Sequence, residues 1–212
     1  MKKLPHGDIF AVPLPDGTFL HGRVLLDIYL TLKRRLFPAN STLPGLGEAS
    51  LIEMYAAISE SVDYAPSPVL IPGAFVESKD VGNAWKVVDR VEVDPREVEF
   101  PETVIGFIHS NGQMAYQCGE IHIGLPFPLT EQERINAYSQ RHSAFLWPYT
   151  CLRVMKRDDE IPLNYKAATL EGTDLRISAI RQAIYEHLPF RMEESYFEKQ
   201  AQLGLHFERL YE

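Results

Sequence analysis

GDIFAVPLPDGTFLHGRVLLDI, residues 7–28, is typical of two strands joined by a tight turn. The apolar run from Ile9 to Leu14 predicts the first strand, and apolar residues resume after the turn. Asp16-Gly17 predicts the turn itself, because glycine adopts the positive φ angle that tight hairpins require. Gly22 inside the second strand indicates a bulge or a close approach of another backbone. The chain is therefore expected to open with a β-hairpin.

Further strands are expected beyond this hairpin. Residues 68–77 read as a strand broken at Pro72-Gly73, and residues 84–93 read as a more regular one. An ion pair is also expected between Asp8, where the first strand begins, and Arg23 beyond the turn. An exposed pair of this kind contributes only about 0–1 kcal/mol.

A second hairpin is predicted in residues 102–124, where Asn111-Gly112 is flanked by β-forming residues. With a two-residue turn, Ser110 faces Gln113 and Ile105 faces Cys118. The face toward the core would then carry Ile105, Phe107, His109, Met114, Tyr116 and Cys118. A register shift of one residue would invert this assignment.

Helices are expected mainly near the C-terminus. The spacing of Leu51, Ile52, Tyr55, Ile58 and Val62 predicts one early short helix. Later signals are a capping box at Thr130 and Glu133, an apolar stripe from Asp174 to Pro189, and a similar stripe in residues 194–212. Residues 143–156 read as one more strand, with Pro148 at an edge or bulge.

The expected fold class is therefore α+β. An antiparallel, strongly twisted sheet or a small SH3-like barrel forms the N-terminal part, and helices gather toward the C-terminus. We expect a β-rich domain over residues 1–165 and a helical extension over residues 166–212 that packs on it as part of one structural unit.

Composition narrows the function classes. The chain has 212 residues, a formal net charge of -8 and a sequence pI near 5.4. This balance argues against nucleic acid or an anionic membrane as the main ligand, since both attract basic surfaces. It fits a basic protein partner, or an acidic surface that serves only solubility. With no signal-like or membrane-length apolar run and only two cysteines, a cytoplasmic location is expected.

Candidate chemistry is sparse. Cys118, Glu120 and His122 alternate, so a regular strand would present all three on one face, but roughly 7 Å apart per step. That distance is too long for a base to activate a thiol directly, so the pattern is interpreted as a strand that leaves the core with its polar residues at the sheet rim. No catalytic residue, cofactor or metal site is predicted. If the protein is a hydrolase, the candidates by elimination are His109, Glu120 and His122.

The opening motif resembles that of the immunity protein 26 family of bacterial polymorphic-toxin systems. The residues that carry the resemblance are Gly7, Asp8, Ile9, Phe10, Pro13, Leu14, Gly17, Gly22, Arg23 and Val24. The resemblance implies a cytosolic, non-enzymatic protein that binds and neutralises a cognate toxin. An acidic surface would suit a basic toxin, because complementary charge speeds encounter and selects partners.

Two alternatives remain beside this hypothesis. The family name has also been attached to a phosphotriesterase, which implies a metal-assisted hydrolase, although no active-site motif carries over. The Gly-Asp-Ile strand is also similar to that of MazF-type endoribonuclease toxins. This acidic chain lacks the arginine-proline pair that follows the strand in those toxins. The charged run Arg157–Glu160 fits a docking patch for a basic partner or a solvated loop.

Overall fold

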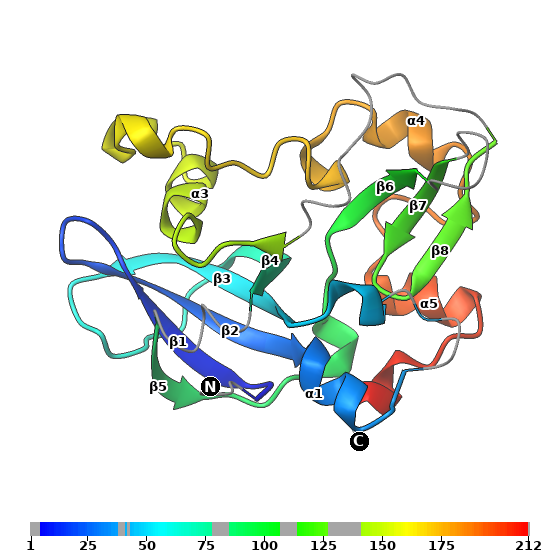
Figure 1. Cartoon of the computed structure of the whole chain (residues 1–212), viewed down its shortest axis with the longest axis horizontal. Coiled ribbons are helices and arrows are strands. Elements are labelled where there is room, and N and C mark those ends of the chain that lie inside the picture. The colour runs from blue at the N-terminus through cyan, green and yellow to red at the C-terminus, as the bar shows by residue number, and fades with distance from the viewer. Residues whose placement is uncertain are drawn as a thin grey trace.

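The protein is described by a computed structural model that covers residues 5–37, 41, 43–77, 85–106, 114–126 and 141–211. The predicted α+β class is confirmed: antiparallel sheets dominate the N-terminal part, and short helices follow toward the C-terminus (Figure 1). Of the two predicted architectures, the twisted sheet is the one formed. Within the described residues, β5 and β9 lie at its two edges and do not pair with each other.

The larger sheet has the strand order β5-β1-β2-β3-β4-β9. Its strands are β1 (Asp8–Pro13), β2 (Phe19–Asp27), β3 (Ala49–Ser59), β4 (Val69–Glu77), β5 (Lys86–Arg90) and β9 (Arg141–His142). Every neighbouring pair is antiparallel except β4 and β9, which run parallel. The smaller sheet has the order β6-β7-β8, with β6 (Glu102–Gly106), β7 (Met114–Cys118) and β8 (Ile121–Gly124).

The first hairpin forms as predicted. Pro13 pairs with Phe19, and the backbone N–H of Leu14 donates to the carbonyl of Thr18. Gly17 has a φ of 88°, a conformation that a residue with a Cβ rarely adopts. The Asp16 carboxylate accepts bonds from the Thr18 N–H and hydroxyl, which fixes the turn from within.

The expected ion pair between Asp8 and Arg23 is wrong. Arg23 pairs across the sheet with Ile9, so the side chains of Arg23 and Asp8 point to opposite faces. Arg23 instead donates to Glu53, its partner on β3, with an Nε–Oε1 distance of 2.8 Å. Asp8 lies 3.7 Å from Arg90 on β5.

The predicted helix over residues 51–62 is also wrong, because this segment forms most of β3. Leu51 faces one hydrophobic cluster, and Ile52 and Met54 face another on the opposite side of the sheet. A strand that is buried on both faces loses the alternation of apolar and polar residues that identifies a strand. Its apolar residues then match a helical spacing by chance.

The break expected at Pro72-Gly73 is a bulge within a continuous strand. Ile52 pairs with Ala74 and Met54 with Ile71, so β4 holds one more residue than β3 between these pairs. The bulge brings Gly73 against the next segment, where an added Cβ would overlap the backbone carbonyl of Glu99.

We therefore expect Gly73→Ala to lower the free energy of unfolding by roughly 1–3 kcal/mol, because the overlapping group is backbone and has little room to move. Urea unfolding followed by circular dichroism measures the change. Gly124→Ala is the matched control, since nothing lies within 4 Å of a Cβ at that position. Equal stabilities of the two variants would contradict the close approach.

The register predicted for the second hairpin is wrong by three residues. Cys118 pairs with Glu102 rather than with Ile105, and Tyr116 pairs with Val104. An odd shift inverts the faces of the first strand, so Val104 is buried and Ile105 is only half-buried. Met114, Tyr116 and Cys118 lie in the core as predicted. Phe107, His109 and the Asn111-Gly112 turn fall outside the described residues, as do Thr130 and Glu133.

The strand expected over residues 143–156 is a helix, α3 (Trp147–Val154). Pro148 lies in its first turn, where the missing N–H costs no intrahelical bond. Trp147, Cys151 and Leu152 are buried and cover one face of the larger sheet (Figure 1).

The other helices are short. They are α1 (Ile28–Lys33), α4 (Arg181–Tyr185) and α5 (Tyr196–Gln202), with 3-10 turns η1 (Leu43–Leu46), η2 (Pro95–Glu97), η4 (Asp158–Glu160), η5 (Leu163–Tyr165), η6 (Leu175–Ile177) and η7 (Phe207–Tyr211). The two apolar stripes predicted after residue 174 each form two short pieces in place of one helix. No helix among the described residues is both long and apolar enough to cross a bilayer.

One hydrophobic core joins the two sheets to the C-terminal segment. It contains Leu25 and Leu51 from the larger sheet and Val104 and Tyr116 from the smaller one. The C-terminal segment contributes buried residues to the same cluster, namely Leu175, Ile184, Phe190, Tyr196, Phe207 and Leu210. Residues from before and after position 166 therefore share one core.

Candidate interaction surface

The residues proposed for hydrolytic chemistry do not form a site in the described part of the chain. His109 lies outside that part. Nη2 of Arg209 donates to both carboxylate oxygens of Glu120, at 2.6 and 2.7 Å. The backbone N–H of Glu120 donates to the Tyr196 hydroxyl. His122 lies on β8 and is exposed as a whole residue. The protein around its ring still removes part of its solvent, and this desolvation lowers its pKa.

The expected single face for Cys118, Glu120 and His122 is wrong, because the chain reverses between them. Gly119 has a φ of 56°, and Cys118 pairs across the resulting turn with Ile121. His122 therefore pairs with Gln117 and shares that residue's side of the sheet, opposite to Cys118. Burial also raises the pKa of the Cys118 thiol, which makes it a poor nucleophile. Among the described residues, no three His, Cys, Asp or Glu side chains are grouped closely enough to hold a metal ion.

A buried polar cluster lies around Glu102 at the start of β6. Arg181 on α4 binds its carboxylate with two bonds of 2.8 Å. The Tyr185 hydroxyl donates to it at 2.5 Å, and Lys199 on α5 lies 3.2 Å away with only 2% of its side chain exposed. No local sequence pattern predicts this cluster, since the partners of Glu102 lie 79 to 97 positions after it along the chain.

The charges in this cluster stabilise one another. Burial alone would raise the pKa of Glu102, but the bonds from Arg181 and Tyr185 and the charge of Lys199 outweigh it, so the pKa is lowered. Burial likewise opposes the charge of Lys199, and the contacts with Tyr185 and Glu102 raise its pKa above the usual range. The cluster stays ionised and ties the smaller sheet to α4 and α5.

The negative charge of the protein is concentrated in one segment. Between Glu48 and Glu102 the sequence has 12 of the 29 acidic residues and 4 of the 21 basic ones. The difference equals the whole formal charge of -8. Two of these carboxylates, Glu53 and Glu102, are buried and paired with Arg23, Arg181 and Lys199 from outside the segment, so only part of this excess is exposed.

Part of this charge lies along the edge strand β5 and the segment that follows it, which leads to η2 beside α5 and η7. We name Asp89, Glu92, Asp94 and Glu97 the acidic strip. Arg96 neutralises Asp94 at 2.6 Å, and this contact lowers the Asp94 pKa to about 2. Among the described residues, the other three carboxylates of the strip form no ion pair, and all three are exposed. The strip therefore presents unbalanced negative charge from β5 to η2.

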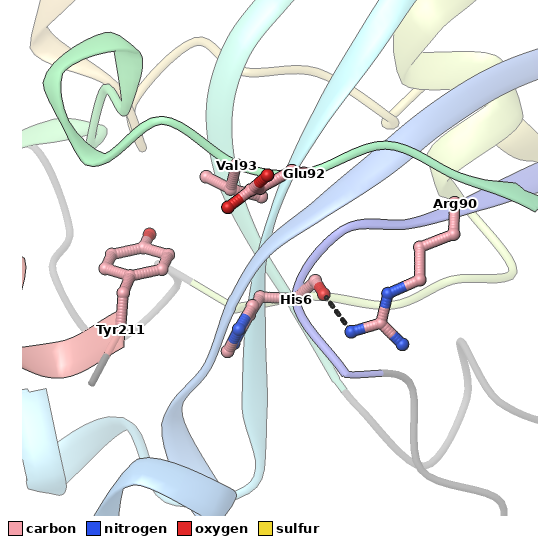
Figure 2. Close-up of a pocket in the computed structure, with 5 residues that line it drawn as sticks. All are labelled: His6, Arg90, Glu92, Val93 and Tyr211. Carbon is pink, nitrogen blue, oxygen red and sulfur yellow. Dashed lines mark hydrogen bonds between the residues drawn. The ribbon is translucent and has the colours of Figure 1, made fainter.

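A pocket of about 450 Å³ opens beside the strip and is lined by His6, Arg90, Glu92, Val93 and Tyr211. Figure 2 shows Glu92, Tyr211 and His6 around one space, with the Arg90 guanidinium turned toward the His6 carbonyl. Tyr211 is fixed by a 2.9 Å bond from its hydroxyl to the Leu25 carbonyl. The His6 ring packs edge-on against it, with 5.3 Å between ring centroids. The two ends of the described chain thus build one wall each.

The electrostatics of the pocket favour a neutral His6. Burial and the nearby charges of Arg90 and Arg34 lower its pKa, against a smaller opposite effect of Asp8. Among the described residues that line the pocket, Glu92 is the one carboxylate, and Arg90 is offset by its contact with Asp8 at 3.7 Å.

The family model for immunity protein 26 matches residues 5–110. This match spans half of the chain. The chain belongs to the immunity protein 26 family. A search of curated proteins and a search of solved structures gave no match.

The immunity protein 26 match contains the whole acidic strip. It also contains every pocket residue except Tyr211. It ends between β6 and β7, so Glu102 lies inside it while Arg181, Tyr185 and Lys199 lie outside.

The charged run Arg157–Glu160, for which the sequence left a docking patch or a solvated loop open, lies outside the immunity protein 26 match. Its charges are largely paired locally, Arg157 with Glu160 at 2.5 Å and Asp158 with Arg153 at 3.4 Å. Exposed apolar side chains lie in the neighbouring segments, namely Phe145, Leu146 and Leu163. The docking role of Arg157–Glu160 stays a prediction.

Proposed function

We propose that this member of the immunity protein 26 family binds and neutralises a cognate, basic bacterial toxin domain in the cytoplasm. Family membership supports the immunity role. The position of the acidic residues supports a basic partner. Residues 48–102, inside the matched region, account for the entire formal net charge of the protein.

The acidic strip is the part of this surface that we assign to the toxin. Its exposed, unpaired carboxylates attract a basic partner during encounter without first breaking an internal ion pair. The adjoining pocket and the half-buried aromatic ring of Tyr211 supply shape and apolar contact beside the charge.

The decisive experiment first seeks a toxin gene on either side of the gene for this protein and then pairs the protein with the toxin domain found there. Expression of that domain alone should stop growth, and coexpression of this protein should restore it. The purified pair should form a stoichiometric complex by size-exclusion chromatography. Failure to protect cells or to bind the domain would contradict the proposal.

If the acidic strip attracts the toxin, the association rate constant should depend strongly on ionic strength, which is not expected for a neutral interface. Raising the ionic strength from about 0.01 M to about 1 M shortens the screening length from roughly 30 Å to 3 Å. We expect the association rate constant with the toxin to fall at least about tenfold, with a smaller change in dissociation. Stopped-flow fluorescence measures both constants.

A charge reversal locates this effect on the surface. Glu97→Lys should slow association several-fold at low salt. Glu186→Lys should leave it unchanged, since Glu186 caps α4 at the opposite end of the molecule from β5 (Figure 1). Equal effects of both substitutions would indicate a response to net charge alone and would contradict the assignment to the strip.

The metal-assisted hydrolase alternative receives no support. Glu120 is engaged with Arg209, and Cys118, Glu120 and His122 do not share a face.

A further inference from the structure

We infer that the pocket lined by His6, Arg90, Glu92, Val93 and Tyr211 receives an arginine side chain of the toxin. This inference rests on the proposed function and names the contact at the centre of the interface. It makes one pocket, rather than the acidic surface as a whole, the source of partner selection.

Glu92 supplies the charge that a guanidinium requires. Its carboxylate lies toward the space between Tyr211 and His6 in Figure 2. Among the described residues it forms no ion pair or side-chain hydrogen bond, while its backbone carbonyl is fixed by Arg23 at 3.1 Å. An incoming cation therefore gains a full carboxylate partner and displaces none.

The aromatic wall is held in place before binding. The Tyr211 hydroxyl is anchored to Leu25 at 2.9 Å, and its ring meets Phe207 with 5.4 Å between centroids. A ring that is already ordered loses little entropy when a guanidinium stacks on it. Arginine is favoured over lysine here, because its planar group can stack on a ring and bind a carboxylate with two bonds.

Arg90 and Arg34 oppose a cation in the pocket, as their effect on His6 shows, and the surrounding contacts limit this opposition. Arg90 is 61% exposed to solvent, donates to the His6 carbonyl at 3.3 Å and faces Asp8. Burial and the neighbouring arginines lower the pKa of His6, which favours its neutral form. The acidic strip continues on both sides of Glu92 and adds an attractive field from Asp89 and Glu97.

The pocket is tested first without any toxin, using N-acetyl-L-arginine amide as the probe. At millimolar concentration it should shift the backbone amide resonances of His6, Glu92 and Val93. N-acetyl-L-citrulline amide has nearly the same shape and no charge, so it should leave them unchanged. In Glu92→Gln the arginine shifts should disappear. Folding of this variant is checked by an unchanged melting temperature, since Glu92 is exposed.

The second test uses the toxin domain identified by the coexpression experiment. Glu92→Gln should raise the dissociation constant of the complex at least about tenfold, as expected for the loss of a charged partner in a central contact. Glu186→Gln, which removes the same charge at the far end of the molecule, should change it less than about twofold.

The outcomes distinguish a failure of the arginine pocket from a failure of the proposed immunity role. If the wild type binds toxin and Glu92→Gln binds equally well, the arginine pocket is overturned and the immunity role stands. If the citrulline probe shifts the same resonances, or the arginine probe shifts none, charge selection in the pocket is overturned. If the arginine probe binds but the toxin domain does not, the proposed function is wrong, and the arginine that the pocket receives does not come from a toxin.

Discussion

Glu102→Ala is expected to lower the free energy of unfolding by about 3–5 kcal/mol, because it leaves the buried charge of Lys199 without its carboxylate partner. Arg181 also loses both of its bonds to Glu102, and the Tyr185 hydroxyl loses its acceptor. Urea unfolding at neutral pH measures the loss. The matched control is Glu160→Ala, which breaks an exposed pair with Arg157 and should cost at most about 1 kcal/mol.

Two further variants distinguish the loss of the Glu102 charge from the loss of its side-chain volume. Glu102→Gln keeps the volume and should still destabilise strongly, since an amide does not neutralise Lys199. Adding Lys199→Met to Glu102→Gln should recover part of the lost stability, because it removes the unpaired buried cation. A cost below about 1 kcal/mol for Glu102→Ala, or no recovery in the double variant, would contradict a strongly coupled cluster.

The same carboxylate predicts a dependence on pH. The pKa of Glu102 in the folded protein is lowered from its ordinary value of 4.5, so folding favours its ionised form. Its contribution is complete above that value and is lost as the pH falls through the lowered pKa. The stability difference between the wild type and Glu102→Gln should therefore shrink below about pH 4.5.

Phe100→Ala is expected to cost a similar 3–5 kcal/mol, because it empties the centre of the shared core. Phe100 is fully buried, and its ring lies 4.5 Å from Tyr196, 5.3 Å from Phe207 and 6.0 Å from Phe75, measured between centroids. These partners come from β4 and from the C-terminal segment, so one side chain connects distant parts of the chain.

Calorimetry or urea unfolding measures this loss against Phe145→Ala, which removes an aromatic ring that is 63% exposed. The control should change the free energy of unfolding by less than about 1 kcal/mol. Phe100→Leu should fall between the two, since it retains much of the buried volume. A Phe100→Ala variant as stable as the control would show that the C-terminal segment does not depend on this contact.

Local chemistry allowed part of the fold to be predicted from the sequence. The first hairpin was predictable because Asp16-Gly17 determines its turn through neighbouring residues alone. The bulge at Pro72-Gly73 was detected as an interruption for the same reason. β3 and α3 were missed because their burial depends on distant partners: β3 is covered on both faces, and Pro148 opens a helix that the sheet packs against.

The candidate surface was less accessible to prediction. The acidic balance is visible in the composition, but the pocket joins His6 to Tyr211 from opposite ends of the chain. The Glu102 cluster likewise collects partners from β6, α4 and α5. The register of β6 and β7 depended on the length of the connection, and an offset of three residues exchanged the inward and outward faces.

The late position of the core residues has a consequence for synthesis. β1 to β4 pair with sequence neighbours, so this part of the sheet can assemble soon after it leaves the ribosome. Phe100 lacks its contacts with Tyr196 and Phe207, and Tyr116 lacks those with Tyr185 and Phe190, until these later residues have been translated. The nascent chain therefore exposes apolar side chains of this core while its C-terminal segment is still being made, a stage at which such surface is prone to aggregate.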